Sequence, residues 1–351
     1  MINFSTAMEL ANDNGEPPDS SSSSKKISLK EPQSTAGSFF VVEEVSDIAK
    51  CELLWQEFSP KRNLFETWEF RYAFYLGYKF SPHFLLLKRR STGVPTEGGS
   101  GYPENLALLP LWFDKDKKIY TWFGSDWQEE VSFFVKDQNY IPILISLAPS
   151  PLYLNAISGK SIELIKGEVA FEDDESKYVL NLGSFRNHKD WLKTLKKNRR
   201  RDLRKDRNRI LRQNPEIILN NFADFEKLIT LAKKRFSQKG EKTDWEDKRR
   251  IETFREVIKL GGKSYQPRMI TIKIGGKVAG VDLVCLYNQT YFAIKCGYDV
   301  ENFSGIGNYM NLFEIDDAIS LGMKKIDFLQ NNYQWKNRWF QPVPLYKFRK
   351  L

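Results

Sequence analysis

The chain has 351 residues, 41% of them hydrophobic and 14% aromatic, which is enough for two domains with a sizeable core. It contains no run of about 18 apolar residues, as a membrane-spanning helix needs, and its start lacks the basic-then-apolar order of a secretion signal. We therefore expect a cytoplasmic protein. The net charge of +9 is concentrated in Lys189–Arg212, where 12 Lys and Arg accompany three Asp, so the rest of the chain is balanced.

Residues 1–38 are rich in Ser, Pro, Asn and charged residues, and we expect a disordered tail because they can bury too little apolar surface. An N-terminal half is predicted from residue 39 to residue 183. It should contain a first strand at Phe39–Val42, then two helices and a series of strands. The helices are predicted near 47–58 and 67–77, and the strands near 84–88, 106–113, 118–123 and 178–182.

A basic helix is predicted at the start of the C-terminal half, which runs from residue 184 to residue 351. The segment 187–214 has no internal Gly or Pro and is rich in strong helix formers. Its few apolar residues leave one narrow packing seam, so its other faces must be solvated or meet an anionic partner. No aromatic residue is interleaved between Lys196 and Arg212 and no base-reading motif is present, so we do not expect a dedicated nucleic-acid reader.

The next stretch predicts a strand, two helices and a three-stranded meander. A strand is expected at 217–219 and a helix from an Asn221 N-cap to Phe236. Thr243 and Glu246 form a capping-box pattern for a second helix that stops at the following Gly-Gly. The meander strands are predicted at 269–274, 278–287 and 290–297. Strands that follow one another without intervening helices indicate an α+β fold and not a doubly wound sheet.

The three cysteines and two histidines predict neither a disulfide nor a metal site. No Cys or His pair has zinc-ligand spacing. A two-residue turn at Asn288-Gln289 would place Cys285 opposite Phe292, so Cys285 and Cys296 would lie about 13 Å apart along the sheet, too far to bridge. We expect both to be buried as small hydrophobic residues.

A glycine-rich turn precedes the last long helix that the sequence predicts. Ser304-Gly305-Ile306-Gly307 opens this helix, and Gly322 follows it at the position of a C-cap. Backbone N–H groups freed by the glycines, together with the helix dipole, suit a phosphate or pyrophosphate. A turn that needs glycine for its shape alone is the alternative.

Candidate site residues gather around this helix. Asp327 lies in a short strand predicted at 325–329, where a lone carboxylate among apolar neighbours is suited to act as a base; a structural acid paired with Lys or Arg is the alternative. Lys336 and Arg338 could hold an anionic group. Tyr309 could protonate a leaving group or simply pack. The catalytic candidates are Asp327, Tyr333 and Tyr309.

Four pieces of the sequence, in this order and spacing, resemble the GNAT acyltransferases, and more specifically the CelD-type acetyltransferase-like proteins related to the FemAB peptidyltransferases. They are Leu108-Leu109-Pro110-Leu111, Phe123-Gly124, the basic run from Trp191 to Arg204, and the run from Ala318 to Trp339. The resemblance covers residues 39–351. It implies two fused GNAT-like halves, each a mixed, mostly antiparallel sheet flanked by helices, with the second half catalytic.

The resemblance further implies direct transfer of an acyl group from acyl-CoA, such as acetyl-CoA, to an amine of an acceptor, without a covalent enzyme intermediate. It implies a pyrophosphate site at Ser304, Gly305, Ile306, Gly307 and Asn308. It also implies substrate-binding roles for Lys336, Arg338, Arg199 and Arg200.

Two alternatives stay open. A FemAB-like aminoacyltransferase would take its donor from aminoacyl-tRNA, whose phosphates would contact the basic helix, although this helix is short beside the long arm that many such proteins carry. A GNAT-fold binding module without catalysis is the other alternative, because Asn302-Phe303-Ser304 stands where GNAT enzymes usually have Arg or Gln.

Overall fold

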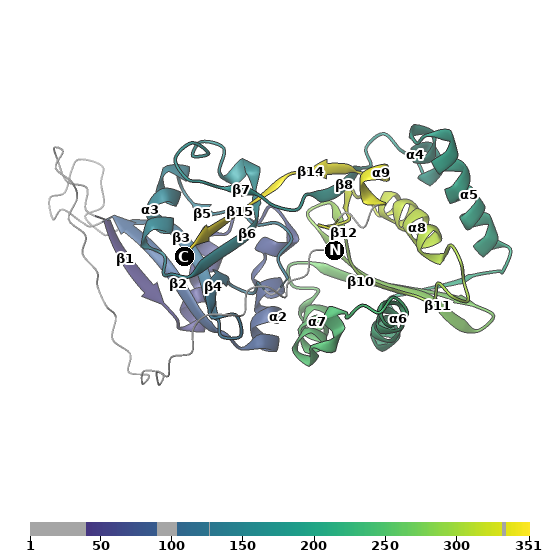
Figure 1. Cartoon of the computed structure of the whole chain (residues 1–351), viewed down its shortest axis with the longest axis horizontal. Coiled ribbons are helices and arrows are strands. Elements are labelled where there is room, and N and C mark those ends of the chain that lie inside the picture. Colours follow the sequence, from purple (N-terminus) through teal and green to yellow (C-terminus); the bar gives the residue numbers. More distant parts are fainter. Residues whose placement is uncertain (1–39, 90–103, 126, 332–334) are drawn as a thin grey trace.

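The structure is a computed structural model that describes residues 40–89, 104–125, 127–331 and 335–351. Figure 1 shows two halves side by side, each built on its own sheet, with the last strand (yellow) lying in the first half. The tail predicted to be disordered lies outside the described residues. None of the helices described combines the length and the apolar character that crossing a lipid bilayer requires.

The first sheet has the strand order β1-β2-β3-β4-β6-β15-β7, with β5 paired to β3. Its pairs are antiparallel except β4 with β6. Its strands are β1 (Phe40–Val45), β2 (Ser81–Arg89), β3 (Glu104–Asp114), β4 (Ile119–Trp122), β5 (Phe134–Val135), β6 (Leu152–Ser158), β7 (Glu172–Asp173) and β15 (Leu345–Lys350). Its helices are α1 (Ile48–Phe58), α2 (Trp68–Tyr78) and α3 (Ile141–Leu147), with short 3-10 turns at Leu64–Glu66, Gln138–Tyr140 and Gly159–Ser161.

The second sheet has the order β14-β8-β13-β12-β11-β10-β9, in which only β12 and β13 are parallel among the described pairs. Its strands are β8 (Lys177–Asn181), β9 (Glu216–Leu219), β10 (Gln266–Ile274), β11 (Lys277–Tyr287), β12 (Thr290–Tyr298), β13 (Lys325–Asp327) and β14 (Gln341–Val343). Its helices are α4 (His188–Thr194), α5 (Lys197–Leu211), α6 (Phe225–Ser237), α7 (Lys248–Leu260), α8 (Ile306–Ser320) and α9 (Lys336–Trp339), with 3-10 turns at Phe222–Asp224 and Asp244–Glu246.

Helices cover both faces of the second sheet (Figure 1). α8 lies on one face with α4 and α5 outside it, and α6 and α7 lie on the other. The predicted α+β class, with two mixed sheets flanked by helices, is therefore confirmed.

The two sheets exchange strands, so the expected boundary between residues 183 and 184 does not separate them. β8 lies before this boundary but pairs with β13 and β14 in the second sheet. β15 lies at the far end of the chain but pairs with β6 and β7 in the first sheet. Apolar patterning marks a buried strand without identifying its partner, so the sequence could not reveal this exchange.

Three helix predictions need correction. The basic segment forms two helices because Leu195 and Lys196 have extended backbones, with ψ of 153° and 142°. Neither Gly nor Pro marks this break. The second correction concerns α7, which begins at Lys248 with Asp247 as its N-cap, while Thr243 caps the preceding 3-10 turn. The third concerns α6, which begins at Phe225 with Asp224 as its N-cap, while Asn221 precedes a 3-10 turn.

The meander and its turn match the prediction. Cys285 lies opposite Phe292, and Asn288 and Gln289 form the turn with φ of 44° and 55°. The three cysteines are free. Cys285 is buried as expected, whereas Cys296 is exposed, because it lies beyond the point where β13 leaves β12.

A common apolar core joins the two halves along α2 and α7. Phe74 of α2 packs edge-on against Phe254 of α7, with ring centroids 6.0 Å apart. Phe65, just before α2, makes a similar contact at 5.7 Å with Phe292 of β12. The first half is therefore packed directly against the strand that carries the candidate site.

Candidate active site

The parallel strands β12 and β13 separate and leave an open edge on β12. Their pairing ends at Phe292 and Asp327, whereas β12 continues to Tyr298. Within the described residues, no strand covers this edge of β12 beyond Phe292. A β-bulge makes Ile294 an extra residue against β11 at the same place, and bulges re-aim backbone groups. Backbone N–H and C=O groups on this edge can therefore bind an extended ligand.

A strained turn holds the chain after β13 away from β12. Leu329 and Asn331 have left-handed φ values of 64° and 67°, which are costly for residues other than glycine. The buried Lys336 ammonium donates to the carbonyls of Phe328, Leu329 and Gln330. Its pKa is lowered to about 8 by burial, partly opposed by Glu129 and Asp327. Lys336, predicted as a substrate ligand, thus points inward and clamps the turn.

Asp327 lies in a buried ion network between the two halves. Its Oδ2 atom is 2.7 Å from Nζ of Lys177 on β8, and its Oδ1 atom accepts the Leu329 N–H at 2.9 Å. Lys177 also pairs with Glu130 of the first half at 2.5 Å. Burial alone would lower the pKa of Lys177, but the two carboxylates outweigh it and raise that pKa. Asp327 therefore contributes to joining β13, β8 and the first half.

Glu129 is a buried acid at the same place that the sequence did not single out. Its Oε2 atom accepts the Gln330 N–H at 2.6 Å, so it lies against the strained turn. Burial raises the pKa of Glu129 to about 7, and Lys336 and Lys295 partly oppose this. A carboxyl that titrates near neutral pH is suited to general base catalysis. The available signal was the acidic pair Glu129-Glu130 between apolar strands.

The loop that carries Glu129 is fixed by the buried Arg71 of α2. Arg71 donates to the carbonyls of Gly124 and Trp127 at 2.9 and 3.0 Å. Gly124 has a φ of 71°, and a Cβ atom there would lie 2.8 Å from the Arg71 carbonyl oxygen. Glycine is thus required at this position, and Phe123-Gly124 was one of the pieces behind the family resemblance.

Lys295 is a second residue that the sequence did not single out. It follows the Ile294 bulge on β12, and its Nζ atom lies 4.8 Å from the Trp127 ring centroid and 2.6 Å from Oδ2 of Asp244. Burial lowers the pKa of Lys295, and Asp244 opposes that change. A lone lysine in an otherwise apolar strand was the available signal. The open edge thus has a buried acid, Glu129, and a partly buried amine, Lys295, on the face toward the first half.

The other face of the open edge has a buried acid pair. Asp282 of β11 and Glu314 of α8 are neighbours. Burial raises the pKa of Asp282 to about 7, although its hydrogen bonds with Tyr298 and Glu314 lower that pKa. Burial, together with the nearby Asp282, raises the pKa of Glu314 well above its ordinary value. Two adjacent buried carboxyls hold a proton between them at neutral pH. Tyr298, at the end of β12, donates its hydroxyl hydrogen to Asp282 at 2.9 Å.

The N-terminus of α8 is occupied by a side chain of α5. Gly305 has a φ of 90°, and a Cβ atom there would lie 2.8 Å from Cβ of Asp206. The Asp206 carboxylate accepts the Asn308 side-chain N–H at 2.7 Å, and Arg209 donates to Oγ of Ser304 at 2.7 Å. The glycine turn forms as predicted, but an anionic side chain already lies where a pyrophosphate was expected.

The other predicted site residues lie apart from the open edge or outside the described residues. Tyr309, in the first turn of α8, packs in the apolar core between this helix and the sheet, and burial raises its pKa. Arg338 is exposed on α9, and Arg199 and Arg200 lie on α5. Tyr333 is outside the described residues.

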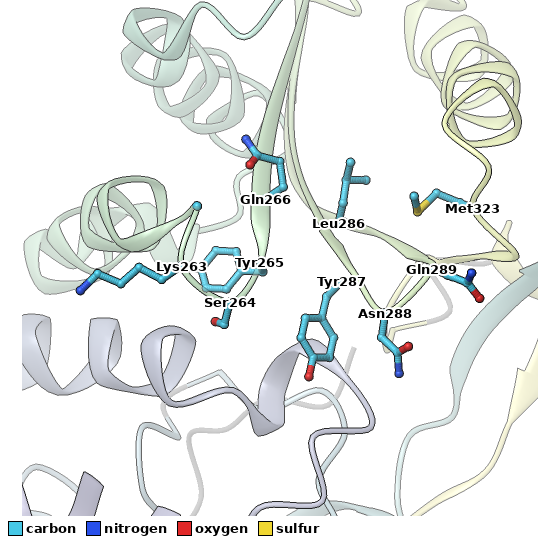
Figure 2. Close-up of a pocket in the computed structure, with 10 residues that line it drawn as sticks. Lys263, Ser264, Tyr265, Gln266, Leu286, Tyr287, Asn288, Gln289 and Met323 are labelled. Atoms are coloured by element: carbon cyan, nitrogen blue, oxygen red, sulfur yellow. The ribbon is translucent and has the colours of Figure 1, made fainter. Parts of the chain in front are cut away.

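A hollow of about 300 Å³ lies at the opposite end of β12 from Lys295. Figure 2 shows Tyr265 and Gln266, at the start of β10, beside Tyr287 and Asn288 at the β11–β12 turn. Asn288 precedes the Ile294 bulge by six residues, or roughly 20 Å of strand. This hollow is therefore separate from the open edge.

The sequence matches a family model, and the fold matches solved structures. A family model described as acetyltransferase (GNAT) domain matches residues 197–337. No curated protein matches the chain. Among solved structures, the chain is similar to FemX, with a TM-score of 0.57 and 9% identity over 88% of this chain and 97% of that one. It is also similar to a conserved protein of unknown function from Bacteroides thetaiotaomicron VPI-5482, with a TM-score of 0.52 and 15% identity over 87% and 97%.

The matched residues include several of the features described above, whereas Glu129 and Lys177 precede the matched span. The span 197–337 starts at α5 and contains the meander, the open edge of β12, the glycine turn and the strained turn after β13. At 9% and 15% identity, the similarity to these two solved structures is evidence for the fold alone. The chain therefore carries a GNAT-superfamily domain over residues 197–337, within a fold that it shares with FemX.

Proposed function

We propose that this protein is an N-acyltransferase that moves an acyl group from a pantetheine thioester, of which acyl-CoA is the simplest, to an amine of an acceptor. The observation that most directly supports this proposal is the unpaired, bulged edge of β12 beside Glu129. A pantetheine arm contains amides and is extended, so it can hydrogen bond to such an edge as an added strand does. The GNAT domain match supports the same chemistry.

In the proposed reaction the acceptor nitrogen attacks the thioester carbonyl carbon. A C–N bond forms, the C–S bond breaks, and the products are an amide and a thiol. Glu129 takes the proton from the amine. An N–H group of the open edge near Ile294 stabilises the oxyanion. The thiolate receives a proton from Tyr298, which draws on the Asp282–Glu314 pair.

Asp327 and Lys336 act in this proposal as positioning residues. Asp327 contributes to joining β13 to β8, and Lys336 clamps the turn that contacts Glu129. Both therefore preserve the opening between the strands. Arg338 remains a candidate for holding an anionic group of the acceptor.

Thiol release from acetyl-CoA, measured across a panel of small amines with the full-length protein, tests the proposal. We expect release that depends on both acetyl-CoA and an amine. Absence of release with every amine, together with absence of calorimetric binding of CoA and acetyl-CoA at millimolar concentration, would contradict it.

The aminoacyl-tRNA alternative is favoured by one observation, the Asp206 carboxylate at the N-terminus of α8, which disfavours a pyrophosphate there. The basic α5 would then contact tRNA phosphates. Steeply salt-dependent binding of tRNA that is lost when Arg199, Arg200, Arg201 and Arg204 are changed to Ala would support this alternative.

A further inference from the structure

The exposed face of α5 and its C-cap residue carry a row of cations that is interrupted at Asn208. The side chains at positions 197, 201, 204, 205 and 212 follow one another at helical spacing and are exposed. The helix has 15 residues, so the row is about 22 Å long. No salt bridge joins Lys197, Arg204 or Lys205 to an acid in the ranges that the structure describes. This row is therefore available to a polyanionic partner.

The row lies close to the proposed donor site. α5 packs against α8, and its Asp206 and Arg209 contact the glycine turn through Asn308 and Ser304. The glycine turn joins α8 to the end of β12, whose open edge would hold the donor arm. A partner bound along α5 could therefore insert an arm toward β12.

Asp206 also discriminates between donors. Free acyl-CoA brings a pyrophosphate, and the Asp206 carboxylate would repel it at the N-terminus of α8. The same pantetheine arm occurs on acyl carrier proteins, where one phosphate links it to an acidic protein. Such a donor places its negative charge on a protein surface, where the row on α5 can contact it.

We propose that α5 is a docking surface for an acyl carrier protein, which supplies the acyl group on its phosphopantetheine arm. This inference rests on the proposed function and names its donor. The chemistry is the thioester aminolysis described above, and it releases the carrier protein with a free arm thiol. Residues Lys197, Arg201, Arg204, Lys205 and Arg212 contact acidic side chains of the carrier, and the arm binds the open edge of β12.

A protein partner fits this surface better than RNA does. α5 has no aromatic residue on which a base could stack. The open edge of β12 offers peptide groups, which match the amides of a pantetheine arm and not the ribose at the end of a tRNA.

The test compares two donors, acetyl-CoA and a bacterial acyl carrier protein loaded with an acetyl group, in the thiol-release assay. We expect kcat/KM to be at least about tenfold higher with the loaded carrier at low salt, and to fall as salt is raised. Changing Arg201, Arg204 and Lys205 to Glu should reduce the carrier-to-CoA ratio of kcat/KM by about tenfold or more. Changing the exposed Lys239, Lys242 and Lys277 to Glu should leave that ratio unchanged.

The outcomes separate the inference from the proposed function. Turnover with acetyl-CoA but not with the carrier would overturn the inference and leave the proposed function standing. Absence of turnover with both donors would overturn both. If tRNA inhibits turnover with the loaded carrier, and this inhibition disappears when Arg201, Arg204 and Lys205 are changed to Glu, the inference would be overturned in favour of an RNA partner. A second variant with Gln at the same three positions checks that charge, and not misfolding, causes the change.

Discussion

At the scale of single residues, the proposed site depends on Glu129, whose burial suits the proposed role as a base and lowers the stability of the fold. Burial raises the pKa of Glu129 from 4.5 to about 7, so the folded protein retains a proton that the unfolded chain releases above pH 4.5. Folding stability therefore falls as the pH rises through this window, by at most about 1.4 kcal/mol per pH unit from this group. Above pH 7 the carboxylate is charged and available as a base.

Replacing Glu129 with Gln tests this account. Gln can still accept the Gln330 N–H but cannot take a proton, so we expect kcat at pH 8 to fall by about 100-fold or more. The rising limb of the pH–rate profile near pH 7 should disappear. Urea unfolding should show a flatter dependence of stability on pH between 4.5 and 7. The matched control is Glu163→Gln, which changes an exposed glutamate and should leave both profiles unaltered. A retained pH–rate limb in Glu129→Gln would assign the base elsewhere.

Sequence reasoning found part of this site and missed the rest for a physical reason. Asp327 and Lys336 stood out because they are charged within an apolar stretch. Their partners lie far away in the chain, since Lys177 is 150 residues from Asp327 and Glu129 is 201 residues from Gln330. A sequence shows that a charge needs a partner but does not show which distant residue supplies it.

At the scale of elements, the glycine turn before α8 has a left-handed backbone at Gly305 and lies in close contact with Asp206 of α5. The sequence predicted this turn and the helix after it, because glycine at a helix start is a local signal. It could not predict Asp206 above the turn, because the packing of α5 on α8 is a long-range property. The break at Leu195 and Lys196 was also missed, because extended backbone there has no marker in residue type.

Alanine at Gly305 should be destabilising for two additive reasons. Its φ of 90° disfavours any side chain, and the new Cβ would contact Asp206. We expect the free energy of unfolding in urea to fall by about 2–4 kcal/mol. Gly322→Ala is the matched control, because Gly322 has a φ of 70° with nothing within 4 Å, and it should cost about 1 kcal/mol. If the Gly305→Ala and Gly322→Ala variants lose the same free energy of unfolding, Asp206 moves aside without cost.

At the scale of the whole molecule, the exchanged strands and the common core make the two halves one folding unit. β15 lies between β6 and β7, and its Leu345 is buried. β8 lies between β13 and β14 in the other sheet. The sequence predicted the class and the order of elements, which local patterns determine. It could not predict the exchange, which depends on strand pairing between distant segments.

Deleting residues 345–351 should destabilise both halves together. The deletion exposes the edges of β6 and β7 and removes Tyr346 and Phe348, which pack against the apolar core of the first sheet. The first half packs on the second through the core that α2 shares with α7, so the loss should spread to the second half. Hydrogen exchange should show a loss of protection in β6 and in β11, with a single lowered urea midpoint. Deleting the exposed Leu351 alone should change neither the hydrogen-exchange protection nor the urea midpoint. Loss of protection confined to the first sheet would show that the halves unfold separately.

The position of β15 also determines when the protein can finish folding during synthesis. Most strands of the first sheet leave the ribosome early, yet β6 lacks its neighbour β15 until residues 345–350 emerge. β8 is made long before β13 and β14, the strands that cover it. We therefore expect nascent chains of this protein to expose apolar strand edges until β15 has been made, and the first sheet to be completed only then.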